Sequence, residues 1–119
     1  MSADPYNSQV RTLFVAPTHA GTVAGGTTVL VNEQGVRVEL AASAENGQLS
    51  VMRFRAWGCP HLVAAAEWVC RHYEGGPVSA LEIFPTARIM EDLAVPTEKT
   101  GRILVLEDAI QSLWRSLSH

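Results

Sequence analysis

The sequence predicts an α+β fold, a three-stranded antiparallel sheet with helices packed on one face. Three β-rich segments follow one another between residues 28 and 56, separated by turn residues. Two later segments, 60–74 and 101–117, carry apolar residues at helical spacing. A sheet this small needs a covering layer. The length of 119 residues fits one domain, 1–119.

The first predicted helix begins at Asn7 or Ser8, which can cap it, and ends before Pro17. Residues 18–26 form a loop, whose glycines lack the lysine and hydroxyl residue of a phosphate-binding loop. Strands follow at 28–31, 36–40 and 52–56. Turn residues at 32–35 and the Asn46–Gly47 pair separate the strands, which predicts an antiparallel meander.

The predicted covering helices come next. Pro60 suits the first position of a helix over 60–74, with Val63, Ala66, Cys70 and Tyr73 along its apolar stripe. Short helices are expected over 78–83 and 86–93, and a loop is expected from Pro96. The final helix, 101–117, has the most regular apolar stripe in the chain. The tryptophans Trp57, Trp68 and Trp114 are expected in the core.

Composition excludes several classes of protein. The net charge of −3 and the scattered basic residues argue against a nucleic-acid binder, which would show a basic stripe. No apolar run approaches the ~20 residues that span a bilayer, so we expect no membrane partner. Residues 1–9 lack the basic start and apolar core of a signal peptide. Two cysteines do not make a disulfide scaffold, and a reducing cytoplasm is the simplest compartment.

Several short motifs occur in an order that resembles a known family. They are the opening segment 6–21, residues 54–59 (FRAWGC), residues 66–69 (AEWV) and residues 106–110 (LEDAI). The order is similar to that of the U-type iron–sulfur cluster assembly scaffolds (IscU/NifU N-terminal-like, resembling the SufE/IscU fold). In that family an aromatic strand ends in glycine and a ligand cysteine, and Glu-Trp-Val lies in the following helix. The resemblance covers roughly residues 6–118.

The ligand positions of that family are mostly changed here. The family binds its metal or cluster through an Ala-Cys-Gly-Asp loop, a second cysteine after the third strand, and a His-Cys pair before the last helix. Only the second cysteine is present, as Cys59, while Gly101 and Arg102 stand in place of the His-Cys pair. This chain keeps Pro96 and Lys99 of the family's chaperone-recognition loop, and we therefore expect these two residues to bind a partner. The resemblance implies iron or an iron–sulfur cluster at a partial or shared site, a cysteine desulfurase as partner, and an Hsp70-type chaperone system.

Cys59 is the residue on which the chemistry depends. It precedes Pro60, so it occupies the N-cap region of a helix, where partial positive charge stabilises a thiolate by about 0.3–1 kcal/mol. By the resemblance, Arg102 lies near it and stabilises the thiolate further. These features suit a sulfur acceptor or a thiolate ligand. The alternative is that Cys59 is a small residue left at a loop-to-helix junction.

Other candidate ligands each have a plainer reading. Cys70 is eleven residues from Cys59 on one helix, about 16 Å away, so the two cannot form a disulfide or share a metal ion. We expect Cys70 in the core. His61 could be a metal ligand beside Cys59, or a solvent-facing residue of the first turn. Glu33 could replace the lost carboxylate ligand, or be a solvated turn residue.

Three functions follow from these residues. The first is an accessory iron–sulfur cluster assembly protein that accepts sulfur on Cys59 or shares a cluster with another chain. The second is a non-catalytic interaction or regulatory protein that has lost cluster binding. The third is a hydrolase or transferase, for which the sequence shows no paired carboxylates, catalytic triad or phosphate loop. We expect that the protein is not an enzyme.

Overall fold

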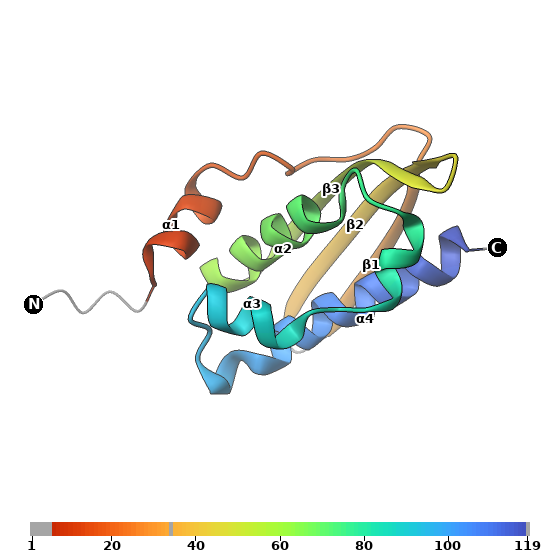
Figure 1. Ribbon diagram of the computed structural model, residues 1–119. Coiled ribbons are helices and arrows are strands. Elements are labelled where there is room, and N and C mark those ends of the chain that lie inside the picture. The colour runs from red at the N-terminus through yellow and green to blue at the C-terminus, as the bar shows by residue number, and fades with distance from the viewer. Residues whose placement is uncertain (1–5, 34, 119) are drawn as a thin grey trace, which may run out of the picture.

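The computed structural model describes residues 6–33 and 35–118, and it has the predicted α+β architecture (Figure 1). A short helix precedes the sheet and the remaining helices follow it. The elements in chain order are α1 (Ser8–Val15), β1 (Thr27–Glu33), β2 (Val36–Glu45), β3 (Gln48–Trp57), α2 (Pro60–Tyr73), the 3-10 helix η1 (Val78–Glu82), α3 (Thr86–Asp92), the 3-10 helix η2 (Thr97–Lys99) and α4 (Thr100–Leu117).

The three strands form an antiparallel meander in the order β1-β2-β3. The β2–β3 turn has two residues with positive φ, Asn46 at 54° and Gly47 at 77°. That combination matches the twist of a tight hairpin and confirms the signal of the Asn-Gly pair. The strands are longer than predicted, and Glu33, expected in a turn, ends β1 opposite Val36. The predicted turn residue Gln34 is outside the described residues.

The sheet has one apolar face and one solvent-facing face, as its alternating sequence predicts. Val38, Leu40, Met52 and Phe54 are buried on the apolar face. On the other face Arg55 pairs with Glu39 (Nη2 to Oε2, 3.0 Å). Trp57 also lies on the solvent-facing side, 45% exposed, with the guanidinium carbon of Arg37 4.8 Å from its ring centroid.

The expectation that Trp57 belongs to the core is therefore wrong. Trp57 follows Phe54 by three residues in β3, so the period of two directs its side chain away from the buried face. Trp68 is buried and Trp114 is partly buried against the core, as expected.

Helices α2 and α4 cover the apolar face side by side (Figure 1). Helix α4 packs on β1 and β2 and buries Ile103, Leu106, Ile110 and Leu113 of its predicted stripe. Helix α2 packs on β3 and is covered on its outer side by α1. Because it lies between two partners, α2 is buried well beyond the predicted stripe.

The connecting segments differ in detail from their predictions. Residues 78–82 form a 3-10 helix, and the loop expected from Pro96 tightens at once into η2, which leads into α4. Among the described residues, no helix has the length and apolar character needed to cross a membrane.

Truncation of Leu106 tests the packing of α4. Leu106 is fully buried, whereas Leu104 on the same helix is 43% exposed. We expect Leu106→Ala to lower the free energy of unfolding by about 2–5 kcal/mol, because it leaves a cavity beside the sheet. Leu104→Ala should change it by no more than about 0.5 kcal/mol. Urea unfolding followed by circular dichroism measures both, and equal losses would contradict the assigned face of α4.

Candidate functional site

Cys59 lies where β3 gives way to α2. It is the N-cap residue of α2, with an extended backbone (φ −77°, ψ 165°), and its side chain makes no capping hydrogen bond. The side chain is partly exposed. Gly58 fixes this connection closely, because a Cβ there would stand 2.6 Å from Leu62 Cδ2 and 3.0 Å from Val36 Cγ1. The backbone of Cys59 therefore has a fixed position, and its thiol is not used in a capping hydrogen bond.

His61 lies one residue into α2 and is fully buried. The expectation of a solvent-facing histidine is wrong, because neighbouring segments cover the first turn of α2. The ring of Tyr6 packs against the imidazole with centroids 4.7 Å apart. Lys99 Nζ approaches His61 Nδ1 at 3.4 Å, and His61 Nε2 is buried with no hydrogen-bond partner among the described residues.

The start of α4 lies next to the start of α2, at the same end of the molecule (Figure 1). Lys99 is the N-cap residue of α4, and Arg102 belongs to its first turn. Burial lowers the pKa of His61, and the positive charges of Lys99 and Arg102 lower it further. We call Cys59, His61, Lys99 and Arg102 the α2–α4 junction.

The junction does not fit a resident metal ion. Among residues 6–33 and 35–118, no three His, Cys, Asp or Glu side chains are close enough together to hold one. The predicted ligands Cys59, His61 and Glu33 therefore do not form a site with each other. Glu33 instead lines a surface hollow of about 290 Å³ with Glu107 and Asp108 of α4. Lys99 and Arg102 add two positive charges that disfavour a bare cation at the junction.

Cys70 is a core residue, as expected. Its side chain is fully buried on α2. Burial raises the pKa of the thiol, and the negative charges of Glu67 and Glu74 raise it further. Cys70 is therefore a poor nucleophile, and Cys59 is the more accessible of the two thiols.

A buried carboxylate that sequence reasoning missed joins the loop before the sheet to α2. Glu67 is fully buried and accepts hydrogen bonds from the His19 backbone N–H (2.8 Å), Thr18 Oγ1 (3.1 Å) and Arg71 Nε (2.6 Å). Burial alone would raise the pKa of Glu67, but these hydrogen bonds outweigh it and the pKa is lowered. The Glu-Trp-Val motif includes Glu67, but it does not indicate that the carboxylate binds the loop before the sheet.

The same loop is fixed to the edge of β3. The Gly21 N–H donates to the Phe54 carbonyl at 2.8 Å, and the Phe54 N–H donates to the His19 carbonyl at 2.9 Å. The His19 ring lies between Glu67 (Nδ1 to Oε2, 2.7 Å) and Glu74 (Nε2 to Oε1, 3.0 Å). Beyond the paired section, the loop and the end of β3 border a hollow of about 450 Å³, lined by Trp57 and by Val63 of α2.

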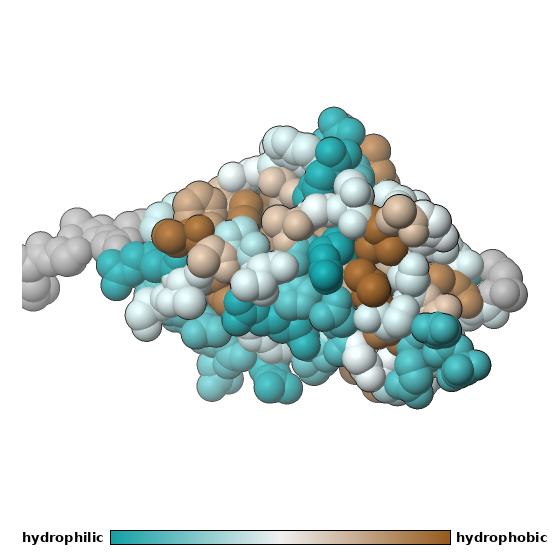
Figure 2. Space-filling view, turned by 90° about the horizontal axis from the view of Figure 1, so that it is seen from above, coloured by the Kyte–Doolittle hydropathy of each residue, from teal (hydrophilic) through white to brown (hydrophobic). Residues whose placement is uncertain are grey.

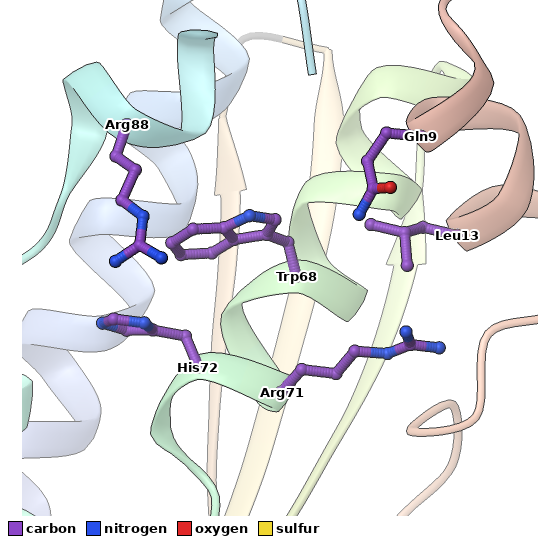
Figure 3. Close-up of a pocket in the computed structure, with 6 residues that line it drawn as sticks. All are labelled: Gln9, Leu13, Trp68, Arg71, His72 and Arg88. Atoms are coloured by element: carbon purple, nitrogen blue, oxygen red, sulfur yellow. The ribbon is translucent and has the colours of Figure 1, made fainter. Parts of the chain in front are cut away.

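A third pocket, of about 390 Å³, lies toward the other end of α2 (Figure 3). Its lining residues are Gln9, Leu13, Trp68, Arg71, His72 and Arg88. His72 stacks on Trp68 with centroids 4.9 Å apart, and the Arg88 guanidinium carbon lies 5.4 Å from the Trp68 ring centroid. Burial lowers the pKa of His72, and so does the charge of Arg88. Among the described residues, the lining holds no serine, cysteine or carboxylate to act with the imidazole.

Apolar side chains on the surface form small patches. Figure 2 shows brown patches interrupted by hydrophilic residues on the face seen from above. The most exposed large apolar residues are distributed over several elements: Phe14, Val15, Leu30, Trp57, Ile83 and Leu104. Apolar side chains scattered in this way do not define a docking face.

The fold is shared with solved structures of low sequence identity. A scan of protein-family models and a search of curated proteins each gave no match to the chain. An iron–sulfur cluster assembly scaffold protein for the SUF system from Fervidobacterium islandicum AW-1 aligns with a TM-score of 0.74 at 12% identity, over 92% of this chain and 96% of that one. The N-terminal part of a nitrogen-fixing NifU-like protein from Brucella abortus aligns with a TM-score of 0.61 at 15% identity, over 92% of this chain and 80% of that one.

A third structure, a hypothetical protein solved at 2.3 Å resolution, aligns with a TM-score of 0.67 at 17% identity, over 87% of this chain and 95% of that one. At these identities the similarity shows the fold. The chain thus has the architecture expected from the resemblance to U-type scaffolds.

Differential alkylation of the two cysteines tests the thiol assignment. Cys59 is partly exposed and Cys70 is buried. We expect one thiol per folded chain to react rapidly with a thiol reagent such as iodoacetamide, because the nucleophile must be both ionised and accessible. Cys59→Ser should abolish the rapid phase and Cys70→Ser should keep it, as measured by mass spectrometry. A rapid phase that survives Cys59→Ser would contradict the assignment.

The acid sensitivity of the fold tests the role of Glu67. Its pKa in the folded chain is below the ordinary value of 4.5, so the stability it contributes is present above that pH and is lost as the pH falls through the lowered pKa. At pH 7 we expect Glu67→Gln to cost about 1–3 kcal/mol of unfolding free energy.

The difference between the wild type and Glu67→Gln should shrink as the pH falls below 4.5. Glu91→Gln is the matched control, since Glu91 is exposed on α3. Urea unfolding at pH 7 and at decreasing pH gives the comparison. A Glu67→Gln deficit that does not depend on pH would show that the charge of Glu67 is not what stabilises the loop.

Proposed function

We propose that this protein is an accessory member of the iron–sulfur cluster assembly machinery that accepts sulfur on Cys59. The observation that carries the proposal is the placement of that thiol. It is partly exposed, caps α2 without a side-chain hydrogen bond, and lies at the junction where α4 also begins. The shared fold and the order of sequence motifs support the biological setting.

The chemistry proposed for Cys59 is a sulfur transfer between thiols. The Cys59 thiolate attacks the outer sulfur of a persulfide on a partner protein, forming a new sulfur–sulfur bond. The sulfur–sulfur bond of the partner's persulfide breaks, and the partner's cysteine leaves as a thiolate. No oxidant or reductant is consumed. The reacting sulfur atom of Cys59 lies at the N-terminus of α2.

The partner that fits this step is a cysteine desulfurase, whose product is a protein-bound persulfide. The chain would then be a sulfur acceptor and not an enzyme in its own right. A reducing cytoplasm suits the proposal, because free thiols persist there. Binding of an Hsp70-type chaperone through Pro96 and Lys99 stays a prediction, and Lys99 directs its ammonium group toward His61.

An iron–sulfur cluster enters this proposal only as cargo shared with another chain. One thiolate cannot hold a cluster that takes four ligands, so the remaining ligands would come from the partner. Anaerobic incubation of the isolated chain with iron and sulfide should therefore give no stable charge-transfer absorption. An absorption band that persists in the Cys59→Ser variant would show that Cys59 is not a ligand of the cluster.

A second function, contact with a partner without sulfur chemistry, is favoured by the missing ligand set. In the described part of the chain no second thiol accompanies Cys59, and no metal-binding group surrounds it. In that case Cys59→Ala would keep every partner in a pull-down and full activity in cells. Loss of activity with retained partner binding would instead support the sulfur-accepting role.

Sulfur transfer can be measured directly. We expect incubation with a cysteine desulfurase and free cysteine to add one sulfur atom to the intact chain, detected by mass spectrometry and removed by a reducing agent. Cys70→Ser should accept sulfur as the wild type does, whereas Cys59→Ser should accept none, because Cys70 is buried. Sulfur found on Cys59→Ser, or on neither protein, would refute the proposal.

A further inference from the structure

The α2–α4 junction contains donors and positive charges without the acceptors that would normally accompany them. His61 is fully buried, yet its Nε2 has no hydrogen-bond partner among the described residues. Arg102 Nε is likewise buried without a partner. Buried polar atoms in proteins are almost always hydrogen-bonded, so each exception requires an explanation, such as a bound ion.

The charges at the junction have one sign. Lys99 and Arg102 are the charged groups whose fields act on His61. In the described part of the chain neither cation forms an ion pair with a carboxylate, whereas Arg53, Arg55, Arg71 and Arg88 each have one. Lys99 Nζ lies 3.4 Å from His61 Nδ1 and 5.4 Å from the centroid of the Tyr6 ring. Two cations held together without a counterion repel one another.

The helix ends add to this positive field. Helices α2 and α4, of 14 and 18 residues, both begin at the junction. Neither has an acidic residue in its first turn, and neither N-cap side chain makes a capping hydrogen bond. A helix N-terminus carries partial positive charge that favours an anion. The field is the contribution here, because the Thr100 N–H already donates to the Thr97 carbonyl and Pro60 has no N–H. Lys99 and Arg102 are partly exposed, so a ligand can approach from their side while Tyr6 covers the imidazole.

From these contacts we infer that the α2–α4 junction binds a small oxyanion, a phosphate or carboxylate group, through Lys99, Arg102 and the buried His61. The imidazole fits this role as a neutral donor: Lys99 Nζ–H donates to Nδ1, which leaves the proton on Nε2 for the ligand. Lys99 and Arg102 supply the opposite charge. The inference does not rest on sulfur transfer, because none of these three donors is the Cys59 thiol.

Titration with inorganic phosphate, with acetate as a second probe, tests the inference. Sodium chloride at matched ionic strength controls for general screening. We expect saturable binding of one phosphate per chain by calorimetry and a rise in the midpoint of thermal unfolding. In nitrogen–proton spectra the Arg102 Nε–Hε signal should shift with the same dissociation constant. If acetate gives saturable binding and the same shift of the Arg102 Nε–Hε signal, the site is assigned to carboxylates.

Two variants and a control locate the site. Lys99→Met and Arg102→Gln should each weaken binding at least about tenfold, because each removes a charged donor. Arg102→Gln should not lower the thermal midpoint in chloride buffer, since it relieves repulsion between unpaired cations. Lys99→Met also removes the hydrogen bond to the buried His61 Nδ1, so we expect a lower midpoint for that variant. Arg88→Gln should bind phosphate normally, because Arg88 belongs to the Trp68 pocket at the other end of α2.

Several outcomes would overturn the inference. They are no saturable binding of either probe, unchanged binding by both junction variants, or signal changes confined to Arg71 and Arg88. Failure of this titration leaves the sulfur-transfer proposal standing, since that proposal is tested on Cys59. Conversely, an inert Cys59 would leave the oxyanion site intact.

Discussion

The burial of one sheet face under two helices is the constraint from which the rest of the structure follows. Three strands cannot bury enough apolar surface alone, so Val38, Leu40, Met52 and Phe54 require a covering layer. Helices α2 and α4 supply it by lying side by side on that face. This packing brings the start of α2, reached directly from β3, next to the start of α4. The candidate site is a consequence of this arrangement.

The electrostatics of the chain divide into two unlike regions. Around Glu67 and Glu74, carboxylates are matched by Arg71, Arg53 and the His19 ring, so buried charge is compensated and the loop before the sheet is held in place. At the α2–α4 junction, Lys99 and Arg102 are not matched in the described residues. The first region stabilises the fold, and the second has the properties of a place where a ligand or partner supplies negative charge.

The fold is that of iron–sulfur cluster scaffold structures, while the donor set of the junction is different. A site for iron concentrates thiolates, imidazoles and carboxylates, whereas this junction offers one thiol, a neutral imidazole and two cations. Such surroundings suit anionic species: a thiolate, a persulfide or an oxyanion. The proposed sulfur-accepting role and the inferred oxyanion site therefore draw on one electrostatic property while depending on different atoms.

Local sequence patterns determined the secondary structure of this protein, because alternation, helical spacing, the Asn46–Gly47 turn and Pro60 act through neighbouring residues. They also singled out Cys59 and the burial of Cys70. The positions of His61 and Glu67 were decided only by the tertiary structure, whereas the alternation within β3 by itself directs Trp57 to the solvent-facing side. The burial of a side chain depends on segments distant in sequence: Tyr6 and Lys99 cover His61, and Thr18 and His19 surround Glu67. Periodicity within one helix contains no information about those partners.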